Sequence, residues 1–153
     1  MIDKTKRSTV VFSENWHKGV VGIVASRLIE THYKPTIVLS ENNGILTGSA
    51  RSVHDFDLYK AISKCAHLCE KFGGHKYAAG LSIKKENIFQ FINEFENIVS
   101  STISANQLIP KIDIDMLIDI DNVNDKLYRI INQFAPFGPK NRNPIFASRG
   151  VVD

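Results

Sequence analysis

Residues 36–51, "TIVLSENNGILTGSAR", place two short apolar runs on either side of a polar stretch. The run "TIVLS" predicts a buried strand and "ILTGSAR" predicts another, because short runs of β-branched and apolar residues between turn residues are typical of strands. The intervening "ENNG" predicts a turn, since asparagine and glycine tolerate the backbone angles that turns require. This segment therefore predicts strand, turn and strand.

The preceding segment predicts a further strand and a helix. Residues 8–13, "STVVFS", are short and β-branched, which favours a strand. From His17 to about His32 the mostly apolar side chains recur at helical spacing, and Pro35 enforces a stop. The recurring residues are Val20, Ile23, Val24, Leu28 and Thr31. The order as far as Arg51 is strand, helix, strand, strand.

The following segment predicts two more helices around one more strand. Asp57 can cap a helix that runs to about Phe72, with one apolar stripe of Leu58, Ala61, Ile62, Cys65, Leu68, Cys69 and Phe72. "AAGLSI" then predicts a strand. Apolar residues mark one face of the last helix at Ile88, Phe91, Ile92, Phe95 and Ile98. Alternating strands and helices indicate an α/β fold.

Cys65 and Cys69 are the only cysteines, and their spacing, with His67 between them and His75 nearby, suggests a metal site. A zinc site usually needs four ligands, often with two cysteines closer together, and a disulfide within one helical turn has poor geometry. Both cysteines also fall on the apolar stripe of the predicted helix. We therefore expect core packing and no metal ligation.

The polar stretch "SSTISANQ", residues 100–107, predicts a domain boundary, with one domain over residues 1–100 and a linker plus a second unit over residues 101–153. In the second unit "KIDIDMLIDID" alternates apolar and acidic residues as a half-exposed strand does. A helix from about Asn122 to Phe134 and a strand in "NPIFASRGVV" are expected to follow. Because these elements make only a thin core, the second unit is expected to be incomplete.

Composition excludes several classes of protein. Lysine and arginine number 19 against 16 acidic residues, so the net charge is only +3 and any nucleic-acid surface must be local. No apolar run approaches the roughly 20 residues that span a bilayer, and the N-terminus has no signal-peptide core. We expect a cytoplasmic protein without membrane contact.

The stretch "WHKGVVGIVASRL" contains more polar detail than packing requires. It begins with Trp16 and His17 and then places Gly19 and Gly22 at the start of the predicted helix. Free backbone N–H groups at a helix start favour anions. The alternative is that the two glycines permit close packing of the helix on a strand.

The stretch "TGSARS" surrounds Arg51 with Ser49 and Ser52 at the end of a strand. A guanidinium fork with neighbouring hydroxyls suits a phosphate, because it supplies charged bidentate donors and short neutral ones. The alternative is a surface arginine in an ordinary turn.

The stretch "FGGHKYAAG" is the most specific of the three. Gly73 and Gly74 allow the main chain to approach a ligand, and His75 can donate to a phosphate or act near a metal. The alternatives are a glycine pair that ends the preceding helix and a structural histidine in a turn.

Taken in order and at their spacing, "WHKGVVGIVASRL", "KPTIVLS", "GSARSVHDFDLYKAI" and "KFGGHKYAAGLSI" resemble the DHHA1 domain of the RecJ family, the bacterial single-stranded-DNA-specific exonucleases. The resemblance covers about residues 8–100. The closing "QFAPFGPKNRNPIF" is similar to the start of that family's oligonucleotide-binding (OB) domain. The implied fold is a DHHA1-type mixed β-sheet with flanking helices, followed by a partial α+β or OB-type segment.

The resemblance implies a 5′-to-3′ exonuclease on single-stranded DNA, active in DNA repair and recombination with Mn²⁺ or Mg²⁺. In that family an upstream DHH domain of the same protein holds the metals, and no Asp-His-His signature occurs in this sequence. The chain would therefore be an inactive fragment that binds no metal itself.

The family's motifs assign roles to individual residues. Ser49 and Arg51, with Ser52 beside them, would bind the DNA backbone phosphate, and Gly73, Gly74 and His75 would face the reacting phosphate. His75 is the catalytic candidate, whereas Trp16 and His17 match a motif without a defined role.

Two rival functions stay open. One is a fragment of a nanoRNase or cyclic-dinucleotide phosphodiesterase of the same DHH superfamily, whose glycine-rich histidine motif is similar. The other is a stand-alone module that binds single strands without cutting them. An upstream frame encoding Asp-His-His would favour the nuclease over the module.

Overall fold

The computed structural model describes residues 5–151, in two compact units. The first unit ends at Pro110 and the second begins at Lys111, so the predicted boundary at residues 100 and 101 lies before this division. Among the described helices, none is long and apolar enough to cross a membrane.

A five-stranded mixed sheet forms the centre of the first unit. Its order is β1-β2-β3-β5-β4, with β1 parallel to β2 and every other pair antiparallel. The strands are β1 Thr9–Ser13, β2 Thr36–Asn42, β3 Ile45–Arg51, β4 Cys69–His75 and β5 Ala78–Lys84. This sheet, flanked by helices, confirms the predicted α/β class.

The strand–turn–strand prediction for residues 36–51 is confirmed. β2 and β3 pair from Thr36 opposite Arg51 to Asn42 opposite Ile45. Asn43 and Gly44 connect them with φ angles of 51° and 78°. Asparagine and glycine are the residues that accept positive φ most readily, and two such residues in a row suit the twist of a hairpin. The turn sequence therefore fixes the register of the sheet's centre.

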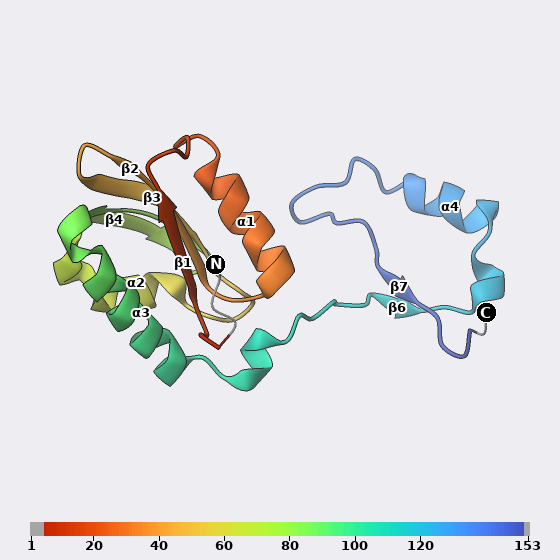
Figure 1. Ribbon diagram of the computed structural model, residues 1–153. Coiled ribbons are helices and arrows are strands. Elements are labelled where there is room, and N and C mark those ends of the chain that lie inside the picture. Colours follow the sequence, from red (N-terminus) through yellow and green to blue (C-terminus); the bar gives the residue numbers. More distant parts are fainter. Residues whose placement is uncertain (1–4, 152–153) are drawn as a thin grey trace. The chain divides into compact units, whose positions relative to one another are not determined.

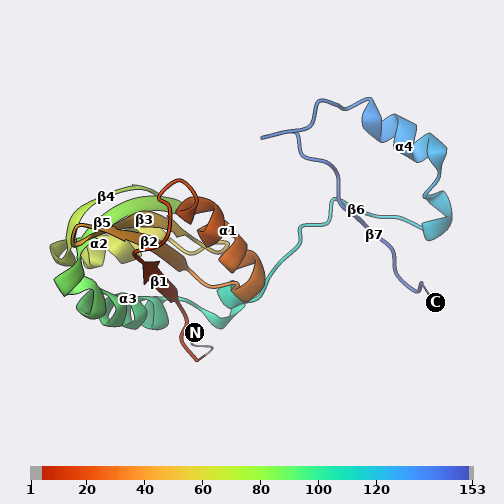
Figure 2. The ribbon, with the colours of Figure 1, turned by 45° about the horizontal axis from the view of Figure 1, so that its top comes forward.

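Helices cover the two faces of this sheet (Figure 1). Helix α1, Val21–His32, packs on β2 and β3, and a small core of Val21, Ala25 and Val38 lies between them. Helices α2, Leu58–Lys64, and α3, Ile88–Thr102, lie on the opposite side, as the turned view in Figure 2 also shows. The main core is there, with Phe91 and Phe95 fully buried.

Helix α1 begins later than the sequence suggested. The predicted start at His17 is wrong, because residues 17–20 form a turn before Val21. In this turn the Gly19 N–H donates to His17 Nδ1 over 3.1 Å, and the Val20 N–H donates to the His17 carbonyl. His17 thus closes a turn, and Gly22 lies in the first turn of the helix.

The predicted helix from Asp57 to Phe72 is also wrong beyond its first half. Asp57 does cap α2, accepting from the Lys60 N–H at 3.0 Å, but the helix ends at Lys64. A short 3₁₀ turn, η1 Ala66–Leu68, leads into β4. A bulge between Cys69 and Lys71 lets Cys69 and Phe72 both face the core from a strand. That bulge imitates helical spacing, which explains the misleading stripe.

The N-terminal segment is fixed to α3 through one carboxylate. Glu96 accepts hydrogen bonds from the backbone N–H groups of Arg7 and Ser8, both at 2.9 Å. The hydroxyls of Ser8 and Ser100 donate to the same carboxylate. Burial alone would raise the pKa of Glu96, but these hydrogen bonds outweigh it and hold the pKa below its ordinary value. The ionised carboxylate therefore stabilises the fold.

The second unit has little regular structure. It contains a two-stranded parallel pair, β6 Met116–Leu117 with β7 Phe146–Ala147, and helix α4, Asp125–Asn132. Asn124 caps α4 by accepting from the N–H groups of Lys126 and Leu127. All three elements are shorter than predicted, and Val152, which the last predicted strand included, lies outside the described residues. The strands β6 and β7 pair over only two residues each, because a two-stranded pair without a third strand is only marginally stable.

Candidate functional site: an open sheet face

The side of the sheet that α1 partly covers carries small and polar side chains on three adjacent strands. Because side chains alternate along a strand, every second residue of β3, β5 and β4 lies on this side. We call the part of this surface that extends from His75 the open face: Thr47, Ser49, Arg51, Ala78, Gly80, Ser82, Lys71, Gly73 and His75. By the same alternation Ile45 and Lys84 form the next row beyond it, where Lys84 pairs with Glu70 at 3.7 Å. The open face itself contains the cationic side chains of Arg51 and Lys71 and no carboxylate, so it suits an anionic ligand.

Ser49 and Arg51 form a preorganised pair on the open face. Arg51 Nη1 donates to Ser49 Oγ at 2.7 Å and to the Ala50 carbonyl at 2.9 Å. Among the described residues neither Nη2 nor Nε of Arg51 has a partner, which leaves charged donors for a ligand. A guanidinium held in this way can bind a phosphate oxygen with little further ordering.

Gly22 brings the first turn of α1 against this pair. A methyl group placed on Gly22 would lie 3.2 Å from Arg51 Nη2 and 3.4 Å from Ser49 Oγ. The glycine therefore leaves the space that Arg51 occupies. Beside it is a shallow pocket of about 310 Å³, lined by Lys18, Gly19, Val21, Gly22, Thr47, Gly48 and Ser49. Two of the three sequence stretches singled out above thus meet at one place.

The two glycines before His75 have different surroundings. A methyl on Gly73 would meet nothing within 4 Å, and Gly73 pairs with Gly80, where the nearest atom would be 3.8 Å away. These two residues leave the floor of the open face without side chains. Gly74 has φ +147°, and a methyl there would lie 2.3 Å from the Ala78 carbonyl oxygen. The fold itself thus requires Gly74. Because Gly73 and Gly74 lie within β4, the alternative that this glycine pair ends a helix is wrong.

His75 ends β4 at the same cross-strand row as Arg51. The row runs from His75 through Ala78 to Arg51, so two strand spacings, roughly 10 Å, separate the Cα atoms of the two ends. His75 is exposed, and its Nδ1 accepts from the Tyr77 N–H at 3.3 Å. In the neutral ring the proton is then on Nε2, which can donate to a ligand.

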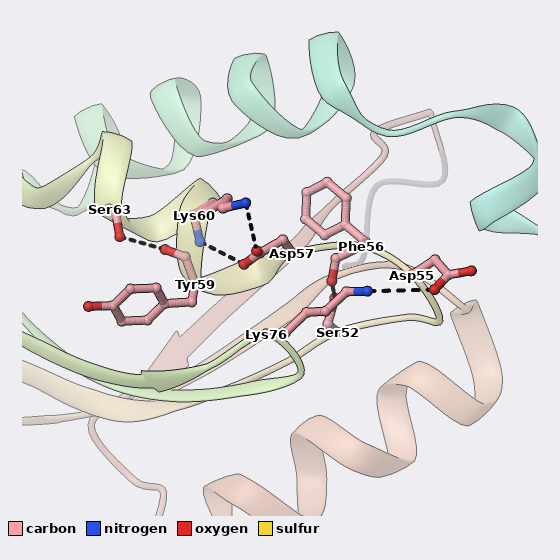
Figure 3. A network of polar contacts seen from close by, with 8 residues as sticks. All are labelled: Ser52, Asp55, Phe56, Asp57, Tyr59, Lys60, Ser63 and Lys76. Atoms are coloured by element: carbon pink, nitrogen blue, oxygen red, sulfur yellow. Dashed lines mark hydrogen bonds and ion pairs between the residues drawn. The ribbon is translucent and has the colours of Figure 1, made fainter.

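The loop of residues 52–57 and the first residue of α2 support the turn that follows His75 (Figure 3). Lys76 Nζ lies 3.5 Å from Asp55 Oδ1, and the Leu58 N–H donates to the Lys76 carbonyl at 3.0 Å. The Ser52 N–H donates to the Tyr77 carbonyl, also at 3.0 Å. Two hydrogen bonds to its backbone and one side-chain ion pair therefore hold the turn that follows His75.

Ser52 is not brought together with the other predicted site residues. Its Oγ donates to the Phe56 carbonyl at 2.8 Å and closes the loop of residues 52–57 (Figure 3). It makes no hydrogen bond to the Ser49 and Arg51 side chains among the described residues.

Three polar residues of the open face are not among the predicted site residues. Thr47, Ser82 and Lys71 were not singled out, although they lie one row from the Ser49 position. The signal was present in "AAGLSIK", where small or polar residues alternate with Ala79, Leu81 and Ile83. Alternation of this kind marks a strand with one face on a core and the other outside it.

Metal binding finds no support in the described residues, among which no three histidine, cysteine or acidic side chains could hold an ion together. Mn²⁺ and Mg²⁺ favour clustered oxygen ligands, so these residues do not fit either ion. Cys65 is free and buried, and burial, followed by the nearby Glu94 and Cys69, raises the pKa of its thiol to about 12. That environment confirms core packing for Cys65, and Cys69 is half-buried.

Family models match most of the chain. A model of the DHHA1 domain matches residues 6–101, and a model of the RecJ OB domain matches residues 114–153. Among curated proteins, the chain is 35% identical over 145 residues to the single-stranded-DNA-specific exonuclease RecJ of Bacillus subtilis and 33% identical over 141 residues to that of Haemophilus influenzae. It covers 18% and 24% of those two proteins, while 94% and 89% of the chain is matched.

Solved structures show the same fold. RecJ of Thermus thermophilus in complex with Mn²⁺ aligns with a TM-score of 0.79 at 24% identity, over 94% of this chain and 21% of that one. The C-Ala domain of Aquifex aeolicus alanyl-tRNA synthetase aligns with a TM-score of 0.53 at 12% identity, over 61% of this chain and 90% of that one. The fold alone therefore does not distinguish a nuclease from a synthetase domain.

Proposed function

This chain belongs to the DHHA1 domain family, and on that premise we propose that its open face binds the phosphate backbone of single-stranded DNA as part of a RecJ-like 5′-to-3′ exonuclease. The Ser49 and Arg51 pair is the observation that carries the proposal. It presents free charged donors beside the glycine-bearing turn of α1, where backbone N–H groups favour an anion. Lys18, in the same pocket, adds a positive charge.

His75 takes the second role in this proposal. From the far end of the Arg51 row it donates Nε2–H to the phosphate that reacts, while Gly73 leaves room for the strand. A group that stabilises charge developing on phosphate oxygens lowers the barrier more than it strengthens binding. Gly74 serves the site indirectly, by permitting the close pairing of β4 and β5.

In this proposal the metal ions would be held by another part of the full-length enzyme. Since the described residues hold no cluster of metal ligands, the Mn²⁺ or Mg²⁺ of the full-length protein would be bound by a separate DHH domain. The chain spans 18% and 24% of the length of two of its curated relatives, which leaves room for such a domain. Residues 1–153 alone should bind single-stranded DNA and hydrolyse none of it. The full-length enzyme would act in DNA repair and recombination.

Equilibrium binding tests the proposal. A labelled, 5′-phosphorylated single strand is titrated with the 153-residue chain and with its Arg51→Ala variant. We expect the variant to lose about 1 to 3 kcal/mol of binding free energy, the range for a charge-assisted contact. Arg27→Ala is the matched control, because Arg27 is an exposed arginine of α1 that pairs with Glu30. Equal affinities for the two variants would contradict the proposal.

A further inference from the structure

A second pocket lies at the end of β2, next to the pocket beside Gly22 and Ser49. It has a volume of about 360 Å³ and is lined by Glu14, Trp16, His17, Lys18, Ser40, Glu41 and Asn42. Lys18 lines this pocket and also the pocket beside Gly22 and Ser49. The two pockets are therefore neighbours.

The loop that carries Trp16 is held through its backbone. Ser40 donates its hydroxyl hydrogen to the Trp16 carbonyl, and the Asn15 N–H donates to Ser13 Oγ at 3.2 Å. His17 is oriented by the Gly19 N–H, as described above. Trp16 nevertheless remains 38% exposed, although it is the largest apolar side chain of the loop. A tryptophan side chain that stays partly exposed offers a flat surface for stacking.

The polar lining of the pocket differs in kind from the open face. Glu14 and Glu41 contribute carboxylates, and Glu41 is paired with Lys85 at 2.7 Å. Carboxylates repel a phosphate but accept hydrogen bonds from amino groups. Asn42 adds an amide that can both donate and accept. The lining therefore suits a neutral, flat ring with a hydrogen-bonding edge, which describes a nucleobase.

We propose that the Trp16 pocket receives a nucleobase of the strand whose phosphate lies against Ser49 and Arg51. The inference rests on the proposed function and adds to it a base-stacking subsite. Bases stack on aromatic side chains with little dependence on sequence, because every base has a π-face. Trp16 would thus hold the strand in position without selecting its sequence.

Trp16 is the single tryptophan of the chain, so its fluorescence reports on this pocket alone. The wild-type chain is titrated with a short 5′-phosphorylated strand and with an abasic strand of equal length and charge. We expect quenching by the base-bearing strand and none by the abasic strand. Trp16→Leu should weaken binding of the base-bearing strand by about tenfold, whereas Trp16→Phe should retain most of the affinity.

The outcomes separate this inference from the proposed function. If Arg51→Ala weakens binding while both strands leave the fluorescence of Trp16 unchanged, the base subsite is wrong and the phosphate site stands. If Arg51→Ala leaves the DNA affinity unchanged, the proposed phosphate site is wrong, and the base subsite that rests on it is wrong as well. Phe89→Leu controls for loss of an exposed aromatic ring elsewhere, since Phe89 of α3 is 69% exposed. Should Trp16→Leu fail to fold, the fluorescence of the wild-type chain with the base-bearing and the abasic strand still tests the base subsite. Equal quenching by the two strands would contradict it.

Discussion

Arg51 Nη1 lies 2.7 Å from Ser49 Oγ, and the two side chains stand on the same face of β3, two residues apart. The hydrogen bond fixes the guanidinium before any ligand arrives, so binding a phosphate needs little additional ordering of a long side chain. Because the remaining nitrogens of Arg51 have no partner among the described residues, the pair has the form of a phosphate clamp.

Substitution of Gly22 should disturb this pair without unfolding the protein. In Gly22→Ala the new methyl group would lie 3.2 Å from Arg51 Nη2, which must move by a few tenths of an ångström. Alanine also favours a helix over glycine by about 1 kcal/mol, which offsets the crowding. We expect the free energy of unfolding to stay within about 1 kcal/mol of wild type and the affinity for single-stranded DNA to fall by about 1 kcal/mol. Denaturant unfolding and DNA titration on one preparation test this; unchanged affinity would contradict it.

The glycines of β4 offer a matched pair of substitutions. Gly74→Ala should destabilise the first unit by about 2 kcal/mol or more, because φ is +147° and the methyl would lie 2.3 Å from the Ala78 carbonyl oxygen. Gly73→Ala meets no atom within 4 Å and should change the free energy of unfolding by less than about 1 kcal/mol. Its methyl should nevertheless weaken DNA binding, because it enters the open face. Equal stabilities for the two variants would disprove the assignment of Gly74 to the fold.

His75→Ala should separate catalysis from folding in a full-length enzyme that carries this sequence. The imidazole is exposed, and in the part of the chain that the structure describes its one hydrogen bond is accepted from the Tyr77 N–H, so the melting temperature should barely move. The rate per folded molecule should fall far more than the DNA affinity, since the group acts mainly in the transition state. A variant that is destabilised but fully active would remove His75 from the site.

Several parts of this fold follow from local sequence signals. The segment "TIVLSENNGILTGSAR" predicts the central hairpin correctly, because an Asn-Gly pair at positive φ leaves few alternatives to a tight turn. The stripe ending at Phe72 fails because the bulge near Lys71 gives a strand the spacing of a helix. Pairing with β5 across the tight turn at Lys76 and Tyr77 makes this segment a strand.

The site was predictable as a set of stretches and not as a surface. Ser49, Arg51 and His75 could be predicted from their motifs. None of those motifs predicts the sheet order, in which β5 lies between β3 and β4. The role of Ser52 depends on a hydrogen bond to Phe56 that the loop conformation creates. Ser82 could be predicted from the alternation in "AAGLSI", whereas Lys71 could not, because the sequence predicted a helix where β4 lies.

The carboxylate of Glu96 should make folding sensitive to acid. Its pKa is held below the ordinary value in the folded state, so its contribution is present above about pH 4.5 and is lost as the pH falls through the folded pKa. Glu96→Gln should therefore lower the free energy of unfolding at neutral pH, by about 1 kcal/mol or more, and flatten its decline in acid. Glu94→Gln on the same helix is the control, because among the described residues the one ion pair of Glu94 is with His67, at 3.4 Å. Parallel stability curves for the Glu96 variant and wild type would contradict this account.

The salt dependence of DNA binding tests the central claim, that Arg51 contacts a DNA phosphate, most directly. Each phosphate neutralised on a single strand contributes a slope of about −0.7 to the plot of log K against log salt concentration. The slope for Arg51→Ala should be shallower than that of wild type by about this amount, whereas Arg27→Ala should keep the wild-type slope. The same slope for all three proteins would show that Arg51 neutralises no phosphate and would contradict the account.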